Sequence, residues 1–213
     1  MTNPKKKKKG GDPRWDHFAQ KAQDRGYKAR SVFKLMEIDQ RFSLFHPGRR
    51  VLDLGCHPGS WLQYAAEKVG PAGQVVGIDR TETEAPRPNI ITIQADLTQP
   101  LEHGALAKPF DVVLSDMAPD TTGIRHVDQD RSMMLAEIAL DYAVRLGRIG
   151  SAFIVKIFQG PEFQKYMASI RQHYSGVRCV RPEATRKTSI EVYVVATGKK
   201  TDSHLTHVDQ PMQ

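Results

Sequence analysis

From residue 50 onward, short apolar runs alternate with longer amphipathic stretches. The runs are nearly continuous Val, Ile and Leu, the pattern of strands that are buried on both faces of a sheet. The stretches between them repeat their apolar residues at helical spacing. The predicted order is strand 51–54, helix 61–69, strands 75–78, 90–94 and 112–115, helix 132–146, strand 152–158, helix 162–173, and strands 177–180 and 190–197. This order predicts an α/β fold with a mostly parallel sheet covered by helices on both faces.

The two ends of this α/β region have their own patterns. Residues 14–45 mix aromatic and basic side chains and predict a helix, a turn at Gly26 and a second helix. Residues 181–189 are polar and contain a proline, so we expect the chain to reverse there and to close the sheet with an antiparallel strand. We expect one domain over 12–198, a basic disordered tail at 1–11 and a loose polar tail at 199–213.

Positive charge is concentrated at one end of the chain. The net charge is +7, and residues 1–34 hold 11 Lys and Arg against 3 Asp and Glu, which leaves the remainder nearly neutral. Basic side chains that neutralise phosphates release condensed counterions, so this asymmetry favours an RNA partner. The run Lys5 to Lys9 fits a solubilising tail at least as well. The expected RNA-binding residues are Arg14, Lys21, Arg25, Lys28 and Arg30.

Several classes of protein are disfavoured by what the sequence contains. No apolar stretch is long enough to cross a bilayer, and the lysine run is not followed by the apolar segment of a secretory signal. Cys56 and Cys179 are isolated and lack the spacing of a disulfide framework or a zinc site. His204 and His207 fit a solvated tail better than a metal site. We therefore expect a cytoplasmic monomer without a bound metal.

The strongest local motif lies at residues 51–61, where a buried strand leads through a short loop into a helix. Gly55 and Gly59 allow the backbone to approach a ligand closely, and Asp53 adds a carboxylate beside them. Their spacing is G-x-x-x-G, so both the G-x-G-x-x-G motif of dinucleotide sites and the Gly-Lys-Ser/Thr of a phosphate loop are missing. We therefore expect a cationic nucleoside here rather than a polyphosphate.

Further acidic residues follow the next apolar runs. Asp79 closes the run 75–78, at a distance from Gly55 that suits contact with ribose hydroxyls. Asp96 follows the run 90–94 and could accept a hydrogen bond from an adenine amine, and Asp116 follows the run 112–115. A single such Asp is often only a turn residue. Several at one sheet edge favour a binding site, because ligands of parallel sheets bind beyond the carboxyl ends of the strands.

Three charged residues stand out against apolar or helical surroundings. Lys156 interrupts the apolar strand 152–158, where an unpaired ammonium would be costly to bury. Glu191 interrupts the last strand in the same way, and Lys34 lies opposite the apolar stripe of its helix. Each has a structural alternative: half of an ion pair for Lys156, a solvated helix face for Lys34, and an edge-strand charge that discourages aggregation for Glu191.

Nearly the whole chain, from about residue 12 to residue 198, resembles the FtsJ-like 2′-O-methyltransferases. The motifs that carry the resemblance are 26–35, 53–61, 114–119, 155–158 and Glu191 in the closing strand. In one place the chain departs from the family: the cofactor loop commonly reads Ala-Ala-Pro-Gly-Gly-Trp, whereas residues 56–61 read Cys-His-Pro-Gly-Ser-Trp.

The resemblance implies a Rossmann-like fold of the kind that binds S-adenosyl-L-methionine (SAM), with SAM as the cofactor. The family's catalytic tetrad falls on Lys34, Asp116, Lys156 and Glu191. Its SAM-contacting positions fall on Gly59, Trp61, Asp79, Asp96 and Asp116, beside Asp53 and Gly55 of the same strand and loop. Resemblance to the bacterial branch implies methylation of a uridine ribose in the A-loop of 23S rRNA in the large ribosomal subunit, whereas relatives act on tRNA or mRNA caps.

The chemistry that the resemblance implies needs help from the protein, because a ribose hydroxyl is a poor nucleophile until it loses its proton. Lys156 is the candidate to accept that proton, or to stabilise the developing oxyanion as an ammonium ion. Two other classes of function stay open at this point. One is a nicotinamide-dependent oxidoreductase, which the missing third glycine disfavours, and the other is a non-catalytic RNA-binding or ribosome-assembly factor that uses only the basic segment.

Overall fold

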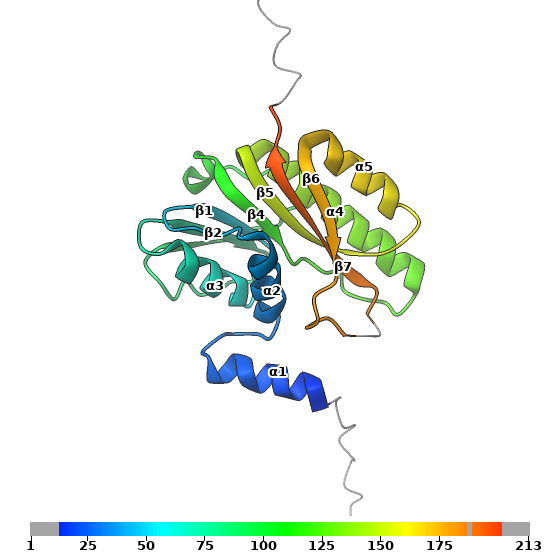
Figure 1. The fold of residues 1–213 in the computed structure, drawn as a ribbon, viewed down its shortest axis with the longest axis horizontal. Helices are drawn as coiled ribbons and strands as arrows, with labels where there is room; N and C mark the ends of the chain where they lie inside the picture. The colour runs from blue at the N-terminus through cyan, green and yellow to red at the C-terminus, as the bar shows by residue number, and fades with distance from the viewer. Residues whose placement is uncertain (1–12, 187–188, 202–213) are drawn as a thin grey trace, which may run out of the picture.

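A seven-stranded sheet with helices on both faces forms the body of the protein (Figure 1). The computed structural model describes residues 13–186 and 189–201. Its strands lie in the order β3-β2-β1-β4-β5-β7-β6. Their bounds are β1 (Arg50–Leu54), β2 (Gln74–Asp79), β3 (Ile90–Gln94), β4 (Phe110–Ser115), β5 (Gly147–Phe158), β6 (Tyr174–Val180) and β7 (Glu191–Lys199). The predicted α/β fold is confirmed.

The helices connect and cover the strands. They are α1 (Pro13–Asp24), α2 (Val32–Phe42), α3 (Ser60–Val69), α4 (Arg125–Leu146) and α5 (Phe163–His173), with a single 3₁₀ turn, η1 (Gly104–Leu106). Alternation along β1 shows how the two faces are filled. Leu52 and Leu54 enter the core under α4 and α5, whereas Val51 enters the core that contains residues of α2 and α3. Successive strand residues point to opposite faces, so both faces of this sheet are apolar.

The antiparallel strand lies inside the sheet rather than at its edge. β7 pairs antiparallel with β5 on one side and with β6 on the other, whereas the β1, β2, β3, β4 and β5 pairs are all parallel. The predicted antiparallel closure is therefore confirmed. Because β7 has a partner on both sides, Glu191 does not lie on an edge strand, and the anti-aggregation explanation of its charge does not apply.

Three of the predicted elements begin earlier in the structure than in the prediction. The helix predicted from Ser132 begins at Arg125, the strand predicted from Ala152 begins at Gly147, and the strand predicted from Val177 begins at Tyr174. The first residues of α4 and of β5 are largely exposed and polar, so hydrophobic periodicity does not mark them. The beginning of α4 is instead fixed by Asp128, which accepts hydrogen bonds from the main chain of Thr122 and Gly123.

The last strand extends into the segment that was predicted as a loose tail. Lys199 ends β7, is 6% exposed, and its Nζ donates hydrogen bonds to the main-chain oxygens of Val144 and Gly147. The prediction of a tail from residue 199 is therefore wrong for Lys199, whose ammonium is held by carbonyls at the end of α4. The lysine run Lys5 to Lys9, His204 and His207 lie outside the described residues.

Helix α1 lies beyond the carboxyl ends of the parallel strands, next to α2 (Figure 1). Phe18 of α1 contacts Phe33 of α2 with ring centroids 5.5 Å apart, and Ala22 is buried between the helices. Gly26 adopts a φ of +75° in the turn that joins them, a conformation that favours glycine. The predicted helix, turn and helix are therefore present, and they place the basic segment at the end of the sheet where ligands bind.

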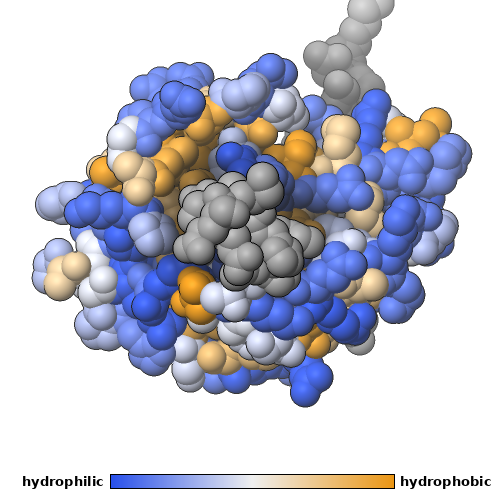
Figure 2. Space-filling view, turned by 90° about the horizontal axis from the view of Figure 1, so that it is seen from above, coloured by the Kyte–Doolittle hydropathy of each residue, from blue (hydrophilic) through white to orange (hydrophobic). Residues whose placement is uncertain are grey.

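The opposite end of the molecule is shown in Figure 2, where polar residues cover most of the surface and apolar residues gather in patches between them. Within the part of the chain that the structure describes, no helix is both long and apolar enough to cross a membrane.

Candidate active site

The sheet reverses its strand order between β1 and β4, and the loop after β1 lies at this point. Gly55, with a φ of +76°, has no room for a side chain, because an added Cβ would overlap Met117 in the loop after β4. Gly59, with a φ of +106°, precedes the first turn of α3. Crevices at such a reversal are the usual ligand sites of open α/β sheets, and these two glycines keep the crevice free of side chains.

Asp53 lies inside β1, one residue before the end of the strand. Its neighbours in the sheet are Gly77 on β2 and Leu114 on β4. Both carboxyl oxygens are buried and make no hydrogen bond with any described residue. Burial raises the Asp53 pKa well above its ordinary value, and the nearby charges of Asp116 and Asp79 raise it further. The crevice thus contains a carboxyl group whose hydrogen-bonding capacity is unused within the described protein.

Asp79 ends β2 and ties together the two loops that border the crevice. One carboxylate oxygen accepts a hydrogen bond from the His57 N–H at 3.0 Å, and the other accepts from the Thr81 N–H at 2.8 Å. Thr83, in the loop after β2, is the residue nearest to the position that a side chain at Gly59 would occupy. The Asp79 carboxylate therefore fixes the shape of the crevice while its remaining lone pairs stay available to a ligand.

Asp96 behaves mainly as a turn residue in the structure. It lies two residues beyond β3 and is exposed, and one of its carboxylate oxygens accepts hydrogen bonds from the main chain and hydroxyl of Thr98. These hydrogen bonds hold the Asp96 pKa below its ordinary value. The structure places Asp96 at the same sheet edge as Asp79, but its role in binding adenine stays a prediction.

Trp61 links α3 to the segment that precedes α2. Its ring is 3% exposed, and its Nε1–H donates a hydrogen bond to the Ser31 carbonyl oxygen at 3.0 Å. The hydroxyls of Ser31 and Ser60 lie 3.0 Å apart beside it. These contacts hold the beginning of α2, which carries Lys34, against the cofactor loop.

The four residues of the predicted tetrad lie close together as two ion pairs. Lys156 Nζ lies 3.0 Å from Asp116 Oδ1 and also donates to the Asp116 carbonyl oxygen. Lys34 Nζ pairs with Glu191 Oε1, and both of these side chains are 15% exposed. Lys34 therefore does not lie on a solvated helix face. The ion pair of Lys156 with Asp116 is the one that the structural alternative predicted. The same contact also fits the catalytic hypothesis for Lys156.

Tyr193 joins the two ion pairs and was missed from the sequence. Its hydroxyl donates a hydrogen bond to Asp116 Oδ1 at 2.6 Å, and Lys34 Nζ lies 5.6 Å from the centre of its ring. It is directly opposite Lys156 in the pairing of β5 with β7. A signal was available, because Tyr193 is two residues beyond Glu191 and therefore points to the same face of the strand.

Opposite charges around Asp116 outweigh its burial. Burial alone would raise the Asp116 pKa, but the positive charges of Lys156 and Lys34 and hydrogen bonds from Tyr193 and Lys156 bring it below its ordinary value. Asp116 is therefore ionised at neutral pH. It holds Lys156 in place at the point where β4 leaves the sheet.

The predicted RNA-binding residues are not collected in one place. Lys21 Nζ and the Arg25 guanidinium lie 5.4 and 5.9 Å from the centre of the Phe33 ring. Lys28 pairs with Glu84, and Arg30 lies half-buried just before α2. Nothing is described for the Arg14 side chain. Lys21 thus lies on α1, whereas Arg25, Lys28 and Arg30 lie between α1 and α2, and the contact of these residues with RNA stays a prediction.

Cys56 is buried and Cys179 is exposed, and both are free thiols. Among the described residues, no group of three or more His, Cys, Asp or Glu side chains is arranged to hold a metal ion.

Comparison with known proteins decides the family. Residues 27–199 match the family model described as FtsJ-like methyltransferase. The chain belongs to the FtsJ-like methyltransferase family. Members of this family use SAM, so the chain is a SAM-dependent methyltransferase.

Similar proteins from bacteria cover almost the whole chain. A protein of Desulfatibacillum aliphaticivorans named ribosomal RNA large subunit methyltransferase E is 46% identical over 94% of this chain and 99% of its own length. A protein of the same name from Bdellovibrio bacteriovorus is 46% identical over 87% of this chain and 97% of its own. The fold is also similar to a crystal structure from Plasmodium falciparum named a ribosomal RNA methyltransferase, with a TM-score of 0.72, 24% identity and coverage of 81% and 98%.

The crevice of this methyltransferase fits SAM. SAM carries a positive sulfonium and an ammonium group, and the crevice offers the carboxylates of Asp79 and Asp116, with the unpartnered carboxyl group of Asp53 buried near them. Gly55 and Gly59 leave the backbone accessible, and the loop has no lysine of the kind that holds a polyphosphate. The loop sequence Cys-His-Pro-Gly-Ser-Trp keeps the backbone accessible, because the glycine before α3 is retained and Cys56 points into the core.

Proposed function

We propose that this methyltransferase transfers the methyl group of SAM to the 2′-hydroxyl of a uridine in the A-loop of 23S rRNA, with the large ribosomal subunit as substrate. The paired charges of Lys34, Asp116, Lys156 and Glu191 carry the proposal, because they lie at the strand ends beside the SAM crevice. The names of the similar bacterial proteins support ribosomal RNA of the large subunit as the target.

SAM supplies an electrophilic methyl group on a positively charged sulfur. The protein must place a ribose hydroxyl in line with that methyl group and assist the loss of its proton. Lys156 is the residue assigned to the hydroxyl, because its Nζ is held at a fixed position by two oxygens of Asp116. As a free amine Lys156 would accept the proton, and as an ammonium ion it would stabilise the developing oxyanion.

The other members of the tetrad keep Lys156 and the ribose in position. Asp116 is ionised and orients Lys156, and Tyr193 fixes the same Asp116 oxygen through its hydroxyl. The Lys34–Glu191 pair lies on the other side of the Tyr193 ring and offers hydrogen-bonding groups of both kinds to the substrate. Because each of these residues comes from one chain, we propose that the monomer is the active unit. Its substrate, the ribosome, would place it in the cytoplasm.

Labelled methyl transfer to large ribosomal subunits tests the proposed function. The subunits are purified from a strain that lacks the gene, and the methylated nucleotide is mapped in 23S rRNA and, in parallel, in tRNA. We expect one labelled 2′-O-methyl group in the A-loop with the wild-type chain and none with Lys156→Ala. Lys108→Ala, an exposed lysine at the other end of the sheet, is the control. Label in tRNA alone, or full transfer by Lys156→Ala, would overturn the proposal.

A further inference from the structure

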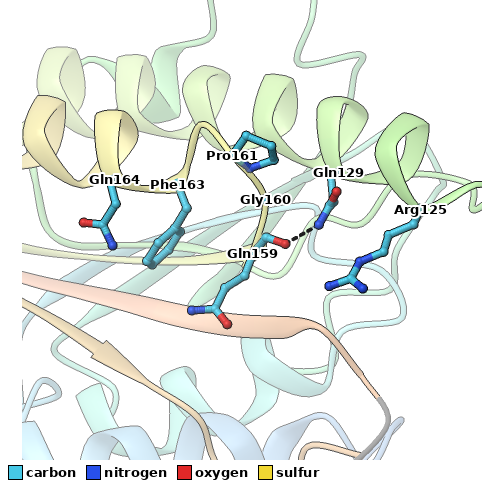
Figure 3. A pocket seen from close by; sticks show the side chains of 7 residues that line it. All are labelled: Arg125, Gln129, Gln159, Gly160, Pro161, Phe163 and Gln164. Carbon is cyan, nitrogen blue, oxygen red and sulfur yellow. Dashed lines mark hydrogen bonds between the residues drawn. The ribbon is translucent and has the colours of Figure 1, made fainter.

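A hollow of about 470 Å³ lies beyond the end of β5, between the beginnings of α4 and α5 (Figure 3). It opens at the same end of the sheet as the tetrad, on the side of the sheet that α4 and α5 cover. Neither the SAM crevice nor the tetrad uses it. The lining residues are Arg125, Gln129, Gln159, Gly160, Pro161, Phe163 and Gln164.

The floor of the hollow is fixed by hydrogen bonds. Gln129 of α4 donates its side-chain N–H to the Gln159 carbonyl oxygen (Figure 3). Gly160 allows this contact, because an added Cβ would lie only 3.2 Å from the amide carbon of Gln129. The Gln159 N–H donates to the Ile190 carbonyl oxygen at 3.0 Å, directly before β7 begins. The floor is therefore anchored to α4 and to the strand that carries Glu191.

The rim of the hollow, in contrast, carries polar side chains without protein partners. Arg125, Gln159 and Gln164 are exposed, and the side chains of all three make no hydrogen bond or ion pair with a described residue. Figure 3 shows Gln164 and Arg125 on opposite sides of Gln159. Arg80 and Asp120, in contrast, pair with each other. Three unpaired polar groups around a fixed floor suit an extended polar ligand.

The hollow lies next to the tetrad residue Glu191. In the pairing of β5 with β7, Phe158 lies opposite Glu191, and Gln159 is the first residue after β5. Lys156 points to the face of the sheet that α2 and α3 cover, so a polynucleotide whose ribose lies at Lys156 passes over the end of β5 to reach Arg125 and Gln164. The basic α1 segment lies on the opposite side of the tetrad, next to α2 (Figure 1). The tetrad thus has the basic α1 segment on one side and Arg125 on the other.

We propose that this hollow holds a nucleotide adjacent to the methylated ribose, an inference that rests on the proposed function. The Arg125 guanidinium binds the phosphate of that nucleotide, since its planar donors match phosphate oxygens. The amides of Gln159 and Gln164 contact the base edge, because each amide offers a donor and an acceptor to an unpaired base. The exposed ring of Pro161 provides the apolar surface between them. The hollow thus contributes to the choice of RNA site.

Kinetics with large ribosomal subunits from the deletion strain test this inference. Arg125→Ala combined with Gln164→Ala should raise KM for the subunits about tenfold, because contacts to a phosphate and a base edge are lost. The kcat and the SAM Kd should stay within about twofold of wild type, since the residues lie outside the crevice and the tetrad. The control is Arg171→Ala, which removes an exposed arginine at the far end of α5.

The outcomes separate this inference from the proposed function. If the wild-type chain methylates the subunits and the double variant has the KM of Arg171→Ala, the inference is overturned while the proposed function stands. If the wild-type chain does not methylate them, the proposed function fails first. A photo-crosslinking amino acid at position 164 provides the second measurement. We expect a crosslink to rRNA within a few nucleotides of the methylated one, and a crosslink to a ribosomal protein instead would contradict the assignment.

Discussion

At the scale of single residues, the active site depends on how four charges are balanced. Asp116 is shared by Lys156 and Tyr193, and its ionised state is maintained by the surrounding positive charges against the effect of burial. Breaking a buried ion pair leaves one uncompensated charge, which is costly. We therefore expect changes at this point to affect both the folded state and the proposed reaction, and the two effects must be measured separately.

The two roles of Lys156 can be separated by Lys156→Arg. An arginine keeps the positive charge but does not act as a base, because it stays protonated in proteins. If Lys156 accepts the proton, Lys156→Arg should lose about as much single-turnover rate as Lys156→Ala, on the order of a thousandfold. We expect this result, with SAM binding retained in calorimetry. Rates for Lys156→Arg that clearly exceed those for Lys156→Ala would favour the oxyanion-stabilising role.

Tyr193→Phe tests the residue that the sequence analysis missed. The change removes the hydrogen bond to Asp116 but keeps the ring that packs near Trp61 and Lys34. We expect the single-turnover rate to fall about tenfold, because Asp116 loses a partner that positions it. The Tyr193 hydroxyl lowers the Asp116 pKa, so its removal should raise that pKa. The low-pH limb of the rate profile should therefore shift to higher pH. An unchanged pH profile would show that Tyr193 acts only in packing.

Asp53→Asn tests the buried carboxyl group through the pH dependence of stability. The Asp53 pKa is raised in the folded protein, so above its ordinary value of 3.8 the folded state binds a proton that the unfolded state has lost. The free energy of unfolding of the wild type should therefore decrease with rising pH relative to the variant, by up to about 1.4 kcal/mol per pH unit. Urea denaturation without SAM between pH 4 and 8 measures the difference. Parallel curves would contradict a protonated Asp53.

Much of this residue-scale picture was available from the sequence. Lys156 and Glu191 stand out because they interrupt apolar runs, and the resemblance to the family implies the tetrad that joins them to Lys34 and Asp116. Tyr193 was not found, because a tyrosine in a strand resembles an ordinary core residue. Asp96 shows the converse, since an acid after a strand forms a turn as readily as a binding site. Side-chain partners are a property of the folded chain, and the sequence pattern does not contain them.

At the scale of elements, α2 and α3 are fixed to each other by Asp39. This residue is 7% exposed, and its carboxylate accepts hydrogen bonds from the Leu44 and Phe45 N–H groups and from the Tyr64 hydroxyl. Ser43 adopts a φ of +51° at the same helix end. The contact closes α2 and holds it to α3, and α2 is the helix that positions Lys34.

Asp39→Ala should therefore destabilise the protein by about 3 kcal/mol, because three hydrogen-bond donors lose their acceptor. The matched control is Gln40→Ala, which changes an exposed neighbour on α2 and should alter stability by less than about 0.5 kcal/mol. Chemical denaturation followed by circular dichroism measures both. Equal stabilities for the two variants would show that the α2 end is held by apolar packing alone.

The elements themselves were predicted well where packing imposes a pattern, and poorly at their exposed ends. Strand 90–94 was predicted with the bounds it has, because its isoleucine-rich run begins at Ile90 and loses its apolar residues at Gln94. The beginning of α4 and the end of β7 were missed, because their limits depend on side-chain hydrogen bonds, of Asp128 with the preceding loop and of Lys199 with the end of α4. The position of β7 between β5 and β6 was also not predicted, because local pattern does not specify strand order.

At the scale of the whole molecule, positive charge and the active site lie at one end. The described basic residues of 13–34 surround the α1 side of that end, and the lysine run precedes them in the sequence. Long-range attraction of this kind raises the rate of encounter with RNA and is screened by salt.

Replacing Lys5 to Lys9 with serine measures the share of the lysine run. For each phosphate that the run contacts, the slope of log affinity against log salt should become shallower by about 0.7 to 0.9. We expect a shallower slope, with kcat at saturating large subunits unchanged because the tetrad is intact. A fluorescence titration of an RNA hairpin between low and high salt gives the slope. An identical slope would assign the run to solubility alone.

The position of β7 also has a consequence for the synthesis of this protein on the ribosome. Lys34 and Glu191 pair across 157 positions, and Tyr193 follows Glu191 on the same strand. A ribosome that synthesises this protein completes the SAM crevice of β1, β2 and β4 long before it reaches β7. Every shorter nascent chain therefore lacks Glu191 and Tyr193, and it leaves the β5 edge open for the strand that must insert beside β6. The proposed tetrad is thus complete only when translation of the last strand is finished.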